Sequence, residues 1–300
     1  MKQQTKSYLF LTFNPRHVRN AHRRLEDLSA KAPSLGTQPE AEREQQRRIW
    51  ALKSLSQKRK AKGKKESSVA TPRELARQLK LCRNDKPCGN AACAHCTRES
   101  HLHQLEQWLQ LMKSGASYKA VTLTFNQEAC SSRMMDQWRN AEGGKTLEKL
   151  KQRIGKTLKR IGCKGPVIGT FTLEHHALHE QETGGYSWLP QLRLLLPNDK
   201  DMLAALQKHM ERAGNCYINA IVSNRPMCVH AFKDLGKQLR YVLDPMWHSV
   251  SCSVDTKDKR LIKGTSVPLG GSSFANSLLV LDCLGKNKIT FTYGEIKGKA

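Results

Sequence analysis

The sequence lacks any apolar run near the roughly 18 residues that a membrane-spanning helix requires, which excludes a helical integral membrane protein. It also lacks a recognisable secretory signal, because the apolar run Tyr8–Phe13 is too short and no small-residue cleavage site follows it. Internal repeats are absent as well. We therefore expect a protein of the cytoplasm, where cysteines stay reduced and serve as metal ligands or buried thiols.

Acidic residues are scarce relative to basic ones. The chain has 51 Lys and Arg against 26 Asp and Glu, a formal net charge of +25. Such a charge destabilises a compact state through self-repulsion unless an anionic partner neutralises it. Nucleic acid is the first candidate for that partner, and an anionic membrane surface is the second. We predict that the protein binds DNA.

The positive charge is concentrated near the N-terminus, where the first 80 residues hold 20 Lys and Arg and 7 Asp and Glu. The run KRKAKGKKESS is typical of a solvated segment that binds phosphates without sequence specificity. We predict four regions: a basic helical arm with linkers (1–80), a zinc knuckle with a helix (81–115), an α+β domain (116–250) and a C-terminal β extension (251–300).

Four of the ten cysteines fall within fifteen positions, in LCRNDKPCGNAACAHC. Thiolates bind zinc tetrahedrally, and a C-x2-C pair supplies two sulfurs from one tight turn. The alternative is an incidental cluster. The spacing is not the commonest one, so His95, His101 or His103 is an alternative to one sulfur. We predict a structural zinc site, with four protein ligands and no open position for chemistry, at Cys82, Cys88, Cys93 and Cys96.

Hydrophobic periodicity predicts strands and helices that do not alternate strictly, which favours an α+β fold with a mainly antiparallel sheet flanked by helices. The expected strands are Ser7–Phe13, Tyr118–Asn126, Pro166–His176, Trp188–Pro197, Cys216–Val222, Leu278–Asp282 and Ile289–Tyr293. The expected helices run from Asn14 to about Ser29, Glu42 to Gln57, Glu99 to Lys113, Cys130 to Ile161, Asp199 to Ala213 and His230 to Leu243.

The predicted strand WLPQLRLLLP has two polar side chains in an apolar run. Gln191 and Arg193 are two positions apart, so they point to the same face of a strand. In the preceding strand Thr170, Thr172 and Glu174 also share one face. An edge strand with one solvated face is the simplest explanation.

Four motifs in a particular order suggest a different explanation. Cys88, Asn90, Cys93 and Cys96 form C-x-N-x-x-C-x-x-C, and the strands VTLTF and GTFTLE follow. The strand WLPQLRLLLP and a helix with one tyrosine, LGKQLRYVLDP, complete the series. Together they resemble the plasmid rolling-circle replication initiators of the HUH endonuclease superfamily. The resemblance covers residues 80 to 250.

This resemblance implies a nuclease that nicks and rejoins single-stranded DNA at an origin hairpin and works with host replication proteins. In the family, two histidines of a W-H-P-H-L-H-L-L-L strand hold a divalent metal such as Mg²⁺ or Mn²⁺. A tyrosine on a helix then attacks the scissile phosphate and keeps the 5′-phosphate covalently. By the motif match, Tyr241 corresponds to this nucleophile and Glu174 to the acidic metal ligand.

The sequence departs from the family at the metal site. Leu189, Gln191 and Arg193 stand where the three histidines are expected. Gln can offer a carbonyl oxygen to a hard cation, whereas Arg has no lone pair to donate and stays protonated. Asp244 replaces the lysine of the family's Y-x-x-K pattern beside Tyr241.

Three hypotheses follow from this departure. In the first, the metal site has decayed and the protein binds DNA without cutting it. In the second, nicking persists, with Arg193 replacing the charge of the metal or with a metal held by Glu174, Gln191 and His176. In the third, the resemblance is accidental and the chain is a zinc-containing regulator or packaging protein. The sequence thus predicts a DNA-binding replication initiator with Tyr241 as candidate nucleophile, and a catalytically inactive regulator as the alternative.

Overall fold

The computed structural model describes residues 27, 36–63, 71–83, 86–113, 116–130, 138–139, 141–177, 188–212, 226–232, 234–254 and 261–294. The predicted strands Ser7–Phe13 and Cys216–Val222 fall outside these residues, and so does the predicted helix that follows Asn14, apart from residue 27. Among the helices that are described, none combines the length and the apolar character that crossing a bilayer requires.

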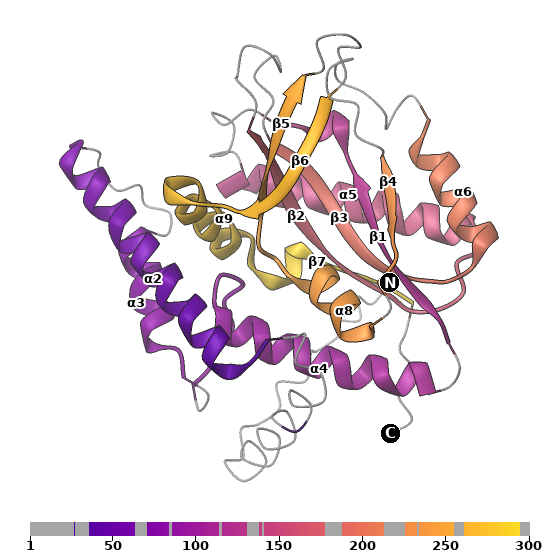
Figure 1. Cartoon of the computed structure of the whole chain (residues 1–300), viewed down its shortest axis with the longest axis horizontal. Coiled ribbons are helices and arrows are strands. Elements are labelled where there is room, and N and C mark those ends of the chain that lie inside the picture. The colour runs from indigo at the N-terminus through magenta and orange to yellow at the C-terminus, as the bar shows by residue number, and fades with distance from the viewer. Residues whose placement is uncertain are drawn as a thin grey trace, which may run out of the picture.

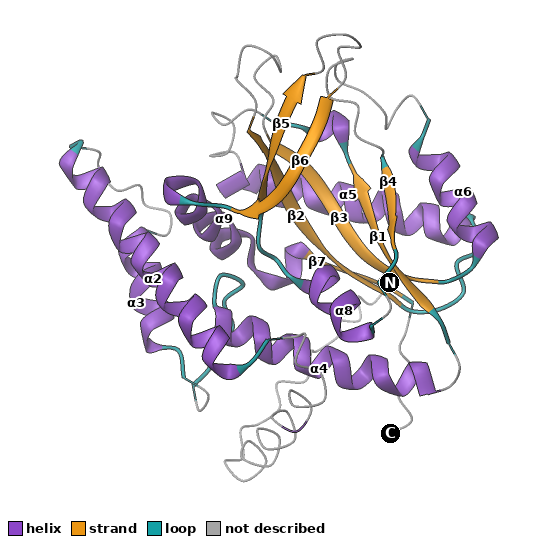
Figure 2. Cartoon of the chain, in the orientation of Figure 1, coloured by secondary structure: helices purple, strands orange, loops and turns teal. Residues whose placement is uncertain are grey.

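A curled sheet of seven strands forms the centre of the molecule (Figures 1 and 2). Six strands follow the order β4-β1-β3-β2-β5-β6, and β7 pairs with β2 beside this path. Only the β2–β5 pairing is parallel, so the sheet is mixed, and the prediction of combined helices and strands is confirmed at this level. The strands are β1 (Tyr118–Thr124), β2 (Val167–Ala177), β3 (Trp188–Pro197), β4 (Met227–His230), β5 (His248–Val254), β6 (Leu261–Pro268) and β7 (Thr290–Tyr293).

Seven described α-helices surround the sheet (Figure 2). α2 and α3 begin with a threonine whose side chain caps the helix, followed by a proline and a reciprocal glutamate at the third helical position. The helices are α2 (Gln38–Ala61), α3 (Pro72–Leu81), α4 (Ala94–Lys113), α5 (Ala141–Arg160), α6 (Lys200–Met210), α8 (Leu235–Leu243) and α9 (Gly271–Ile289). A short 3-10 helix covers Asn126–Glu128.

One face of the sheet is apolar and carries the main core. Alternate residues of β1, β2 and β3 share one hydrophobic cluster with α5, α6 and α9, and α5 crosses behind the sheet in Figure 1. Gly169 allows β2 and β3 to approach closely there, because a Cβ at this position would collide with the Arg193 carbonyl oxygen. The strand residues of this face are Val121, Leu123, Phe171, Leu173, Leu192, Leu194 and Leu196.

The opposite face is polar along most of its length and apolar only at one end. At that end α4 and α8 pack on Ala120, Ile168 and Leu195 in a second hydrophobic cluster. The remaining central residues are hydroxyl, amide, carboxyl and guanidinium side chains, which we call the polar face: Thr122, Thr124, Thr170, Thr172, Glu174, Gln191 and Arg193.

The C-terminal part corrects several predictions. Leu278–Asp282, predicted as a strand, lies in α9, where its residues are buried on nearly all sides and therefore show no helical polarity in the sequence. Gly285, with a φ of 68°, interrupts α9. The structure also has β5 and β6, which were not predicted. His230, predicted as the start of a helix, ends β4 instead.

Candidate functional site

The candidate site lies where α8 crosses the polar face. In the antiparallel register Arg193 is opposite both Thr122 of β1 and Thr170 of β2, while Gln191 is opposite Thr124 and Thr172. This register puts the polar pair of β3 in the middle of the sheet. The edge-strand explanation for Gln191 and Arg193 is therefore wrong.

Tyr241 projects from α8 onto this face. Its hydroxyl oxygen lies 2.6 Å from Oγ1 of Thr122. Oγ1 of Thr122 in turn lies 2.9 Å from Nε2 of His230. The guanidinium carbon of Arg193 lies 4.7 Å from the centre of the tyrosine ring. The structure thus brings the candidate residues Tyr241 and Arg193 into contact and adds Thr122 and His230.

A cavity of about 420 Å³ opens beside the tyrosine. Three cationic side chains line it against one carboxylate, so its charged groups carry a net positive charge and are suited to an anion. We call it the tyrosine cavity. Its lining residues are Arg193, Phe232, Lys237, Arg240, Tyr241, Asp244, His248 and Ser266.

Arg193 is almost entirely buried yet incompletely paired. One of its terminal nitrogens, Nη1, donates to the backbone carbonyl oxygen of Tyr241 at 3.4 Å. Its Nε atom is buried without an acceptor in the part of the chain that is described. A buried donor without a partner costs about 1–3 kcal/mol, which a bound anion can recover.

Glu174 and Gln191 lie farther along the same face. Glu174 is opposite Leu189 of β3 and next to His248 of β5 in the register. Its Oε1 accepts from Nε2 of His176 at 2.7 Å. Glu174 therefore has His176 as a partner, and Gln191 is buried between two threonines.

This arrangement does not fit a catalytic divalent metal. The fixed charge of Arg193 occupies the middle of the face, next to Gln191, and repels a cation. The carboxylate and imidazole of Glu174 and His176 bind each other. Within the described residues, the four cysteines are the one group of three or more His, Cys, Asp or Glu side chains whose ligand atoms all lie within 4.8 Å of one another.

Burial sets the protonation of the groups around the tyrosine. Burial raises the pKa of Tyr241, and the nearby Arg193 opposes that rise. Burial, and then the charge of Arg193, lower the pKa of His230 below its usual 6.5. The same two causes lower the pKa of His248. Around neutral pH the site therefore holds a protonated phenol beside neutral imidazoles and a permanent cation.

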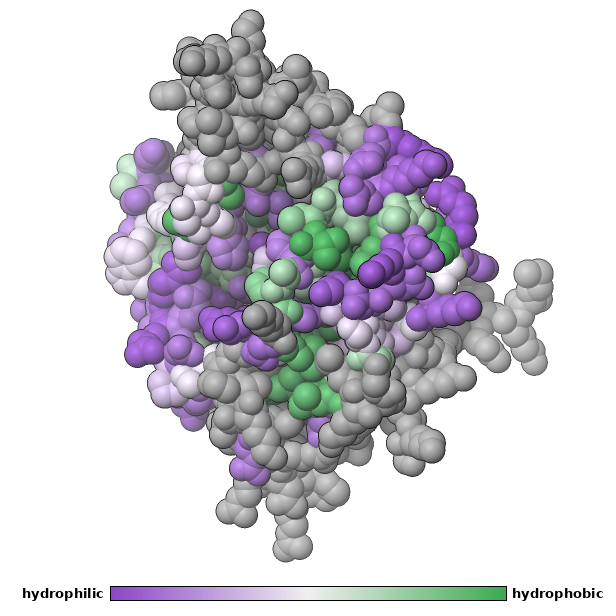
Figure 3. Space-filling view, turned by 45° about the vertical axis from the view of Figure 1, so that its right-hand side comes forward, coloured by the Kyte–Doolittle hydropathy of each residue, from purple (hydrophilic) through white to green (hydrophobic). Residues whose placement is uncertain are grey.

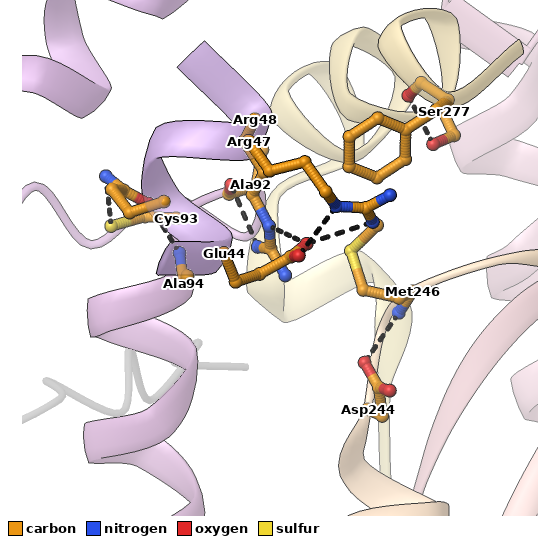
Figure 4. A network of polar contacts seen from close by, with 11 residues as sticks. Glu44, Arg47, Arg48, Ala92, Cys93, Ala94, Asp244, Met246 and Ser277 are labelled. Carbon is orange, nitrogen blue, oxygen red and sulfur yellow. Dashed lines mark hydrogen bonds and ion pairs between the residues drawn. The ribbon is translucent and has the colours of Figure 1, made fainter. Parts of the chain in front are cut away.

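Asp244 caps the C-terminus of α8. Its Oδ1 accepts from the backbone N–H of Met246 at 2.9 Å and fixes the turn after the helix (Figure 4). It also lines the tyrosine cavity. The negative charge at this position leaves Lys237 and Arg240 as the cations that α8 contributes.

A second cavity of about 400 Å³ adjoins the first, and we call it the interlayer cavity. It lies between α2, α4 and the segment from α8 to β5, and it shares Arg240, Asp244 and His248 with the tyrosine cavity. Figure 4 shows how Glu44 of α2 binds both Arg47 and Arg48 on its wall, at 2.8 and 2.9 Å. Because they share these residues, the two cavities form one groove from the tyrosine to α2.

The four cysteines come together between α3 and the first turn of α4. Their sulfurs are 3.5 Å apart for Cys82 and Cys93, 3.6 Å for Cys82 and Cys96, and 3.7 Å for Cys88 and Cys96. Tetrahedral zinc with bonds of about 2.3 Å places its sulfurs about 3.8 Å apart. The geometry therefore fits a metal ion, and none of His95, His101 or His103 belongs to the set.

Hydrogen bonds within the cluster favour the thiolate of Cys93, and the same bonds raise the pKa of the Cys88 thiol. Hydrogen bonds from the Cys88 and Cys96 thiols lower the pKa of the Cys93 thiol to about 4. Nε2 of Gln45 donates to Sγ of Cys93 at 3.4 Å, and the backbone N–H of Cys88 donates to Sγ of Cys82 at 3.4 Å. N–H donors of this kind orient and stabilise metal-bound sulfur.

The cluster also joins the N-terminal helices to the rest of the fold. Gln45 of α2 donates to the carbonyl oxygen of Leu79 at 2.8 Å and accepts from the N–H of Ala94 at 2.9 Å. Lys286 of α9 donates to the carbonyl oxygen of Cys96 at 3.0 Å. The cluster therefore lies at a junction of α2, α3, α4 and α9.

Sequence reasoning missed three residues of the tyrosine site. Thr122 was visible only as part of a threonine-rich strand, and His230 was assigned to a helix. His248 belongs to a strand that was not predicted. A repeated alternation of threonines in VTLTF and GTFTLE was the available signal, because it marks a polar sheet face that extends over two strands.

Comparisons with protein-family models, with curated proteins and with solved structures gave no match to this chain.

Proposed function

We propose that this chain is a DNA-binding protein of the replication-initiator type that joins a single-stranded DNA phosphate covalently to Tyr241. The observation that carries the proposal is the position of Arg193. Its buried guanidinium lies beside the tyrosine, and its Nε donor has no acceptor among the described residues. A phosphodiester is the anion that a strongly basic protein most often binds.

The charge distribution supports nucleic acid as the ligand. Lys237 and Arg240 are exposed on α8 and line the tyrosine cavity together with Arg193. The adjoining interlayer cavity adds three arginines and two glutamates to the groove, so arginines continue along the path of a bound strand. Figure 3 gives one view of the described surface, where hydrophilic residues cover wide areas and hydrophobic residues gather near the middle.

The chemistry needs no oxidant or reductant. The phenol oxygen of Tyr241 forms a bond to phosphorus, the bond between phosphorus and the 3′-oxygen breaks, and the 5′-phosphate stays on the tyrosine. The phenol proton is released, and the leaving 3′-oxygen takes a proton. Arg193 would stabilise the extra negative charge of the transition state, the role that a metal ion has in other phosphoryl-transfer sites.

The deciding experiment is incubation with a labelled single-stranded oligonucleotide that carries a hairpin, followed by denaturing electrophoresis. A covalent protein–DNA band is expected for the wild type and for Tyr293→Phe, a matched control on β7. The band should disappear in Tyr241→Phe. A band that persists in Tyr241→Phe would refute the role of Tyr241.

A second candidate function is a DNA-binding regulator without nuclease activity. The pairing of Glu174 with His176, and the replacement of the histidines by Gln191 and Arg193, favour it. The same assay separates the two functions, because a regulator binds the oligonucleotide without forming a covalent band.

We also propose zinc as the ion of the cysteine cluster, with a structural role. Four sulfur ligands and no open position are typical of structural zinc sites. The N–H donors to the sulfurs, from Gln45 and from the backbone of Cys88, support the proposal.

A further inference from the structure

Three side chains from three elements form a continuous chain of hydrogen bonds under the tyrosine. Thr122 of β1 lies between Tyr241 of α8 and His230 of β4, with 2.6 Å to the phenol oxygen and 2.9 Å to Nε2 of the histidine. The threonine hydroxyl has one proton. If it donates to His230, it must accept from Tyr241, so every bond points from the phenol towards the imidazole.

We infer that His230 is the general base of the reaction and removes the proton of Tyr241 through the hydroxyl of Thr122. This inference rests on the proposed function, because it assigns the fate of the phenol proton in that reaction. His230 takes the role of base that Glu174 does not take, because Glu174 is hydrogen-bonded to His176.

The proton balance closes over the three groups. As the phenol oxygen of Tyr241 bonds to phosphorus, its proton moves to Oγ1 of Thr122, and the hydroxyl proton of Thr122 moves to Nε2 of His230. The 3′-oxygen that leaves takes a proton from water, and the imidazolium later returns its proton to water. Thr122 ends the cycle unchanged.

The surroundings of His230 suit this role. The ring stacks on Phe232 at 5.6 Å with 15° between the planes, and it contacts the ring of Tyr241 at 4.5 Å. Gln238 of α8 donates to the carbonyl oxygen of Phe232 at 3.0 Å, which holds the segment after β4 against the helix. The imidazole is therefore oriented before any DNA binds.

Three charged or titratable groups among the described residues face His230. They are Arg193 from β3 and Tyr241 from α8, together with Cys228 on the same face of β4. Burial and the Arg193 charge lower the pKa of His230. At a pH above the usual histidine pKa the ring is therefore neutral and can accept a proton. Arg193 then acts twice, because it also stabilises the phenolate that the base creates.

A second threonine–histidine pair in this protein provides a matched control. Oγ1 of Thr157 on α5 lies 3.1 Å from Nε2 of His209 on α6, and these helices cover the opposite face of the sheet. Burial lowers the pKa of His209 too. The control pair thus has the same residue types without a relay, because the one proton of the Thr157 hydroxyl is donated to the carbonyl oxygen of Arg153 at 3.0 Å.

The experiment measures the rate of covalent adduct formation against pH with a single-stranded oligonucleotide. His230→Gln and Thr122→Val should each lower the rate by about 100-fold, the usual lower bound for loss of a general base. Thr122→Ser keeps the hydroxyl and should stay within a few-fold of the wild type. His209→Gln and Thr157→Val should leave the rate unchanged.

The pH profile separates a proton relay from a packing role. The wild-type rate should rise through an inflection below pH 6.5, the ordinary histidine pKa, and then level off. In His230→Gln this inflection should vanish, and the rate should keep rising with hydroxide. A rate and profile unchanged in His230→Gln would overturn the inference while leaving the proposed function intact.

A second measurement does not require nicking. Nitrogen NMR of the free protein should show His230 protonated at Nδ1 and accepting at Nε2 above its pKa. A proton at Nε2 would overturn the inference in any case. Failure of the wild type to form an adduct, in contrast, would refute the proposed function and with it the catalytic use of the relay.

Discussion

The guanidinium of Arg193 lies over the ring of Tyr241, with 4.7 Å from its carbon to the ring centre and 3.4 Å from Nη1 to the backbone oxygen of the tyrosine. Two elements distant in sequence, β3 and α8, are held together by this contact. Because the cation is fixed by burial, it cannot move away when a phosphate approaches. The contact explains why a leucine-rich strand has an arginine in its middle.

The cysteine cluster should contain about one zinc ion per chain. Elemental analysis of protein purified without added metal checks this. Cys93→Ser should lose the metal and lower the melting temperature, because zinc binding contributes directly to folding stability. Cys228 is an exposed cysteine on β4, and the Cys228→Ser variant should keep the metal and the melting temperature of the wild type. A folded wild-type protein without metal would contradict the assignment.

Gln45→Leu should destabilise the protein. The change leaves the buried N–H of Ala94 without its partner, at about 1–3 kcal/mol, and removes one of the two donors to the carbonyl oxygen of Leu79, which keeps the N–H of Cys82. Urea unfolding of the wild type and of Gln45→Leu measures the difference in their free energies of unfolding. Gln46→Leu is the matched control, because Gln46 is exposed one position along the same helix. Equal stabilities for the two variants would show that α2 is not bound to the cluster in this way.

Stability should depend on pH through Glu44. Burial tends to raise the pKa of Glu44, but the hydrogen bonds and charges of Arg47 and Arg48 outweigh it and lower the pKa below 4.5. A lowered pKa stabilises the fold above the unfolded value, and this contribution is lost as pH falls through the folded value. Glu44→Gln should therefore lower the free energy of unfolding at pH 7, and the difference should shrink towards pH 3.

The matched control for Glu44 is Glu42→Gln, an exposed glutamate on the same helix that accepts only from Gln38 among the described bonds. It should change stability little at either pH. A difference between wild type and Glu44→Gln that stays constant from pH 7 to pH 3 would exclude the ion pairs as its cause.

The α8 cations should contribute to DNA affinity in a salt-dependent way. Lys237→Gln should weaken binding of single-stranded DNA and reduce the slope of log K against log salt by about 0.7, the value for one phosphate contact. Lys149→Gln removes an exposed charge on α5, behind the sheet, and should leave the slope unchanged. Equal slopes for both variants would place the DNA elsewhere.

The sheet at the candidate site could be predicted well from the sequence, and the C-terminal part could not. The strands around Thr122, Glu174 and Arg193 alternate between polar and apolar residues, because one face packs on helices and the other forms the site. Residues 278–281 of α9 are consecutive, apolar and fully buried, so Leu278–Asp282 gave no helical period. The capping box at Thr71 was a readable signal for α3 that the periodicity analysis missed.

The site itself could be predicted only in part. The motif order placed Tyr241 and Arg193 in one site, and the structure brings them into contact. The motif pattern also implied that Glu174 and Gln191 belong to a metal site, but Glu174 is bound to His176 instead. His230 and Thr122 meet only because β4 pairs with β1, and a pairing between strands about a hundred residues apart is not visible in the local sequence.

The most direct test of the account is covalent adduct formation in excess chelator, with single-stranded DNA and a short incubation after which the zinc content is measured. If Arg193 replaces the metal, the wild type forms the Tyr241 adduct under these conditions, and Arg193→Ala loses it while staying folded. An adduct that forms only after Mg²⁺ or Mn²⁺ is added back, or that persists in Arg193→Ala, would contradict the central claim.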